Sequence, residues 1–107
     1  MNYAFINICN PIETQKSIIQ QIAKIKREEI DVWLELDICI LNNFSKSYFK
    51  ENDNVFISNL KLFKSECMIT TMNVLKICSS KKIKVFSQEN LDKSPLYLIC
   101  LLNKIAS

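Results

Sequence analysis

The absence of glycine from all 107 residues constrains this chain more than any other feature. Turns that need a positive φ must use other residues, and Asn and Asp tolerate that region best. We expect the following residues to take this role: Asn42, Asn43, Asn52, Asn54 and Asn90. The absence also excludes the glycine-rich loops in which P-loop and Rossmann proteins cradle phosphate with their backbone.

Composition predicts a packed globular chain of modest charge. Hydrophobic residues make up 49% and charged residues 23%, and the length is that of one domain covering 1–107. The net charge is +3, and Arg27 is the single arginine among the basic residues. Because phosphate recognition favours the planar fork of arginine, this balance is only a weak indication of nucleic-acid binding.

Cysteine and histidine usage narrows the chemistry further. The five cysteines, Cys9, Cys39, Cys67, Cys78 and Cys100, lie in apolar runs without CxxC spacing, so we expect small buried side chains in a reducing cytoplasm. There is no signal-like leader and no apolar run near the ~18 residues of a membrane span. The chain has no histidine, the commonest general base, and we expect no metal and no small-molecule cofactor.

Periodicity predicts alternating strands and helices. Apolar runs and period-two alternation place strands at 3–8, 32–40, 55–58 and 82–87. Helical spacing places helices at 13–27, 43–50, 65–78 and 96–105. This order predicts an α/β fold: one three-layer domain with a mostly parallel four- to five-stranded sheet and helices on both faces.

Local signals mark where the predicted helices begin and which faces they bury. Asn10-Pro11 and Ser94-Pro95 are typical of a cap followed by proline at the first helical position, and Ser65 can cap the third long helix. Gln15 falls on the polar face of the first helix. The last helix is apolar on nearly every side, which fits either a partner chain or burial inside its own domain.

Four segments in order resemble the catalytic domain of serine recombinases, the resolvase/invertase family. They are 3–7 (YAFIN), 15–22 (QKSIIQQI), 54–65 (NVFISNLKLFKS) and 87–95 (SQENLDKSP). The last segment is similar to the family's T-E-N-I-D-T-x-T-P stretch, and an apolar helix follows it as in the family. The resemblance implies a resolvase-like fold over nearly the whole chain.

The resemblance also implies which positions would carry the family's chemistry, a serine attack on a DNA phosphodiester beside clustered arginines. The nucleophile position holds Asn7, a nearby arginine position holds Phe5, and the D-R-x-x-R positions run from Leu60 through Lys61 to Lys64. Nucleophile and arginines are replaced, so the resemblance implies an inactive domain. Lys61 and Lys64 either keep weak DNA phosphate contacts or belong to a solvated loop.

These observations predict a degenerate recombinase-like domain that acts by protein association in DNA recombination or mobile-element regulation, without the DNA-binding domain that follows in the family. The expected partner is a second copy or an intact recombinase, and the expected interface residues are Leu98, Leu101, Leu102 and Ile105. One alternative is a divergent active recombinase using Ser17, Ser58 or Ser65. Another is an unrelated flavodoxin-like binding domain.

Overall fold

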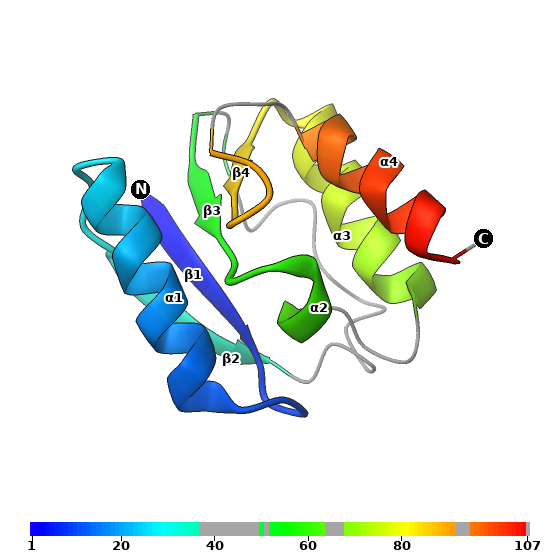
Figure 1. Cartoon of the computed structure of the whole chain (residues 1–107). Coiled ribbons are helices and arrows are strands. Elements are labelled where there is room, and N and C mark those ends of the chain that lie inside the picture. Colours follow the sequence, from blue (N-terminus) through cyan, green and yellow to red (C-terminus); the bar gives the residue numbers. More distant parts are fainter. Residues whose placement is uncertain (37–49, 51, 64–67, 92–94, 107) are drawn as a thin grey trace.

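The computed structural model describes residues 1–36, 50, 52–63, 68–91 and 95–106, which form a parallel α/β fold (Figure 1). The elements are β1 (Asn2–Asn7), α1 (Ile12–Ile25), β2 (Val32–Leu36), β3 (Asn54–Phe56), α2 (Leu60–Phe63), α3 (Met68–Ser80), β4 (Lys84–Phe86) and α4 (Pro95–Ala106). The four described strands lie in the order β2-β1-β3-β4, and every neighbouring pair is parallel. The predicted α/β class and parallel sheet are confirmed.

Strand β1 lies inside the sheet and contributes to both of its faces. Tyr3 pairs with Val32 of β2 and Val55 of β3, which sets the register on both sides. Because side chains alternate along a strand, Phe5 enters one hydrophobic core while its neighbour Ala4 enters the other. A parallel strand covered on both faces reads as a continuous apolar run, as this one does.

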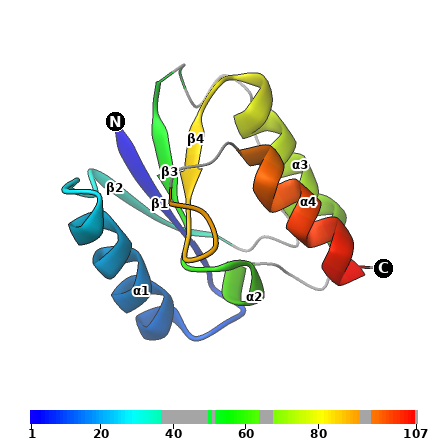
Figure 2. The same cartoon turned by 45° about the horizontal axis from the view of Figure 1, so that its top comes forward.

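The two cores correspond to helices on opposite faces of the sheet (Figures 1 and 2). On one face, α1 contributes Ile19 and Ile22. On the other face, α3 and α4 lie side by side and contribute buried side chains that include Leu75 and Leu98.

Two helices end in the same six-residue motif, at positions where glycine would be expected. Arg27 follows α1 with φ 56°, and Lys82 follows α3 with φ 58°. The amides of the residues after them, Glu28 and Ile83, donate to carbonyls five residues back at 2.9 Å each. These are Schellman motifs, in which the left-handed residue is usually glycine, so a chain without glycine places side chains there.

The expected asparagine turns are only partly confirmed. Asn52 has φ 74°, as predicted. Asn54 instead starts β3, and Asn90 has a negative φ and donates its side-chain amide to the Val85 carbonyl at 2.9 Å. Residues 42 and 43 lie outside the described residues. The prediction considered only turns and overlooked helix ends, which commonly close with a residue in the left-handed region.

Several local predictions also need correction. Pro11, not Asn10, is the N-cap of α1, and no side chain caps that helix. The side-chain amide of Asn10 instead donates to the Leu62 carbonyl at 2.7 Å, so this side chain makes a contact with α2. The short helix α2 was not predicted. The predicted helix at 43–50, apart from residue 50, and the caps Ser65 and Ser94 lie outside the described residues.

Burial corrects the predicted environment of several cysteines and leucines. Cys78 is buried as expected, but Cys9 and Cys100 are exposed, and the other two cysteines lie outside the described residues. Leu98 and Leu102 are both 0% exposed inside the core of this chain. They therefore cannot form a surface interface, and the alternative of a helix buried within its own domain accounts for them.

Candidate functional site at the carboxyl edge of the sheet

The candidate site lies where the strands β1 and β3 end. The chain leaves β1 through α1 towards β2 on one side, whereas β3 pairs on the other side, so β1 and β3 flank the point where the strand order reverses. Open α/β sheets bind ligands outside the carboxyl ends of their strands at such a point. Asn7 ends β1, and Ser58 follows β3 at this edge.

Asn7, the position of the implied nucleophile, is fully buried and held by hydrogen bonds. Its side-chain Nδ2 donates to the Phe63 carbonyl at 3.1 Å, and its Oδ1 accepts the Cys9 amide at 3.0 Å. The first bond connects the end of β1 to α2, and the second closes the turn after β1. The side-chain amide of Asn7 therefore has a structural role.

Gln15 of α1 completes this network from the neighbouring helix. Its Nε2 donates to the main-chain carbonyl of Asn7 at 2.8 Å, and its Oε1 accepts a hydrogen bond from the main-chain N–H of Asn7 at 3.0 Å. Gln15 is 0% exposed, so its predicted place on the polar face of the helix is wrong. Helical periodicity assigns a polar residue to the solvent face, and it has no signal for a glutamine that pairs with a buried strand end.

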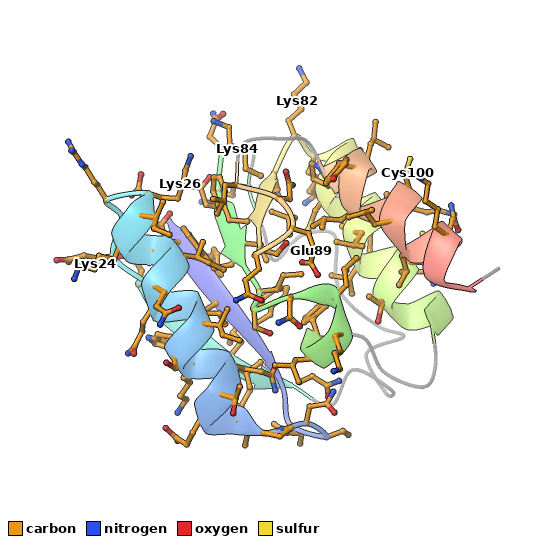
Figure 3. The ribbon with its side chains drawn as sticks, viewed as in Figure 1. Lys24, Lys26, Lys82, Lys84, Glu89 and Cys100 are labelled. Atoms are coloured by element: carbon orange, nitrogen blue, oxygen red, sulfur yellow. The ribbon has the colours of Figure 1, made fainter. Side chains whose placement is uncertain are left out.

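A second network holds α2 against the turn after β4. The Glu89 carboxylate, labelled in Figure 3, accepts the Leu60 amide at 3.0 Å and the Ser87 hydroxyl at 2.9 Å. Asn59 accepts the Leu62 amide at 2.9 Å and donates to Gln88 at the same distance. A carboxylate thus occupies the start of α2, where the first amides point outward. Sequence reasoning assigned no role to Glu89.

Among the described residues, the other implied site positions do not form a cluster of charged groups. Phe5 is 0% exposed and stacks on Phe63, with ring centroids 6.5 Å apart. Leu60 is also in the core, whereas Lys61 is exposed on α2. Lys64 lies outside the described residues. Phe5 therefore contacts the Phe63 ring, Asn7 bonds to the Phe63 carbonyl, and Leu60 lies on the same short helix α2. These are core and backbone contacts.

The two described candidate serines lie in different parts of the fold, one on α1 and one after β3. Ser58 is fully buried, and its hydroxyl has no hydrogen-bond partner among the described residues. Ser17 is exposed on α1, and Ser65 lies outside the described residues. Ser58 is the one of the two described serines that stands at the strand ends. A buried neutral hydroxyl is a poor nucleophile without an adjacent base.

Metal ligands do not gather in the described part of the chain. Glu35 pairs with Lys16 at 3.1 Å near the surface, and Asp37 lies outside the described residues. Across the described ranges, no three His, Cys, Asp or Glu side chains are placed to share an ion. In the same ranges, no helix is both long and apolar enough to cross a bilayer.

No protein-family model matches the chain, and no curated protein matches it in sequence.

Proposed function

We propose that this chain is a non-catalytic binding domain, a degenerate relative of the serine recombinase catalytic domain, that acts by protein association in DNA recombination or mobile-element regulation. The observation that carries the proposal is Asn7. Its amide stands at the implied nucleophile position, fully buried, with donor and acceptor both bonded to main-chain groups. A side chain used in this way cannot present an attacking atom to a phosphodiester.

The surroundings of Asn7 support the same conclusion. Cleavage of a phosphodiester needs a nucleophile and cations that neutralise charge on the phosphoryl oxygens. Phe5 places an aromatic ring in the core where the resemblance implies an arginine, and among the described residues Lys61 is the only implied arginine position that holds a cation. One flexible lysine supplies a monovalent contact and no fork of donors.

The association surface that we propose is the exposed side of α4. Leu96 is 57% exposed, Cys100 is exposed, and Tyr97 and Leu101 are partly buried. Leu101 belongs to the predicted interface, whereas Leu96 and Cys100 replace the buried leucines of that prediction. The side chain of Ile105 lies outside the described residues. We assign a second copy of this chain as the partner, because the resemblance implies dimerisation through this helix and two-fold contacts are self-complementary.

Sedimentation equilibrium of the purified chain tests this association. We expect a dimer at high micromolar concentration that Leu96→Lys or Cys100→Lys dissociates. Ile25→Lys is the matched control, because Ile25 is 64% exposed at the end of α1 on the other side of the sheet. A monomeric wild-type chain, or equal dissociation by the control, would contradict the proposal.

Incubation with supercoiled DNA tests the absence of catalysis. We expect no covalent protein–DNA adduct after denaturing electrophoresis. The competing function, an active recombinase with a displaced serine, requires an adduct, and Ser58→Ala is the first variant to examine because Ser58 stands at the strand ends. An adduct that this substitution abolishes would overturn the proposal.

A further inference from the structure

We draw no further inference here: the strongest candidate, the hollow between the end of α1, the amino ends of β3 and β4 and the start of α4, shares Leu96 with the association surface already proposed, and nothing among the described residues shows what occupies it.

Discussion

Asn7 and Gln15 are joined by a reciprocal pair of hydrogen bonds, in which the side-chain amide of Gln15 donates to and accepts from the main chain of Asn7 at 2.8 and 3.0 Å. The glutamine amide thus pairs with a strand end as a neighbouring backbone would. Both residues are 0% exposed, so water cannot replace these bonds. The pair connects α1 to β1 at the point where the sheet would otherwise present its candidate site.

Gln15→Leu should lower the free energy of unfolding by about 2–4 kcal/mol, because two buried main-chain groups of Asn7 lose their partners while the side-chain volume is kept. Urea denaturation followed by Trp33 fluorescence measures the change. Gln20→Leu is the control, since Gln20 is exposed on the same helix and its replacement should stay within about 0.5 kcal/mol. Equal stability of the two variants would mean that the Asn7 pair contributes little.

Lys82→Gly and Arg27→Gly should each raise the free energy of unfolding by about 0.5–1 kcal/mol. Both residues hold the left-handed backbone at a helix end. Glycine has no Cβ and so avoids the steric cost of this conformation, which is larger than the extra conformational entropy that glycine loses on folding. Ser80→Gly, inside the last turn of α3, should lower stability by about 0.5–1 kcal/mol. Thermal and urea unfolding compare the three, and a loss of stability in all of them would contradict the left-handed assignment.

Leu98→Ala should cost about 2–5 kcal/mol, whereas Leu96→Ala should leave stability nearly unchanged. Leu98 is 0% exposed in the core that α3 and α4 share, and truncation there leaves a cavity. Leu96 lies two residues earlier on the same helix and is 57% exposed. Denaturant unfolding at concentrations where the chain is monomeric separates these effects from association. Similar losses in both variants would place α4 in a different rotation.

Cys78 should resist thiol reagents in the folded chain. Burial raises the pKa of the Cys78 thiol to about 12, because desolvation disfavours the thiolate. Labelling at pH 8 followed by peptide mass mapping should modify the exposed Cys9 and Cys100 first, and Cys78 only after urea is added. Labelling of Cys78 at the rate of Cys100 would contradict its burial.

The same pKa gives a pH dependence of stability with a definite sign. In the unfolded chain the Cys78 thiol loses its proton near the ordinary thiol pKa of 9.0, while burial raises this pKa to about 12 in the folded chain. The folded state therefore binds more protons between these values, and this contribution to stability falls as pH rises through that window. Between pH 8 and pH 10, the free energy of unfolding should decrease less for Cys78→Ala than for the wild type.

Much of the local structure could be predicted from short segments of sequence. The apolar run at the start of the chain became β1, and the alternation after Val32 became β2 as far as Leu36. The cap-and-proline signal before Pro95 preceded α4. These signals depend on period and local chemistry, which a segment carries by itself. The parallel order followed, because helices between strands leave few other topologies.

The candidate site was less predictable, because its contacts join residues that are distant in sequence. No periodic pattern indicates that Asn7 bonds to Phe63, or that Glu89 holds the start of α2. Single-residue signals assigned Lys82 to the start of a strand and Gln15 to solvent, since pattern alone does not record what packs on a helix.

The sequence by itself determined the class of fold and the alternating order of strands and helices, because both follow from the spacing of apolar residues along a short stretch. It also left the chain without a glycine for its left-handed positions. Only the tertiary structure decided which side chains meet. Gln15 is buried and bonds to the main chain, and Leu98 is enclosed in the core. Arg27 and Lys82 adopt a positive φ at the two helix ends, a conformation that usually belongs to glycine. The burial of Gln15 and Leu98 depends on contacts across the chain, where the cost of an unpaired buried group outweighs local preference.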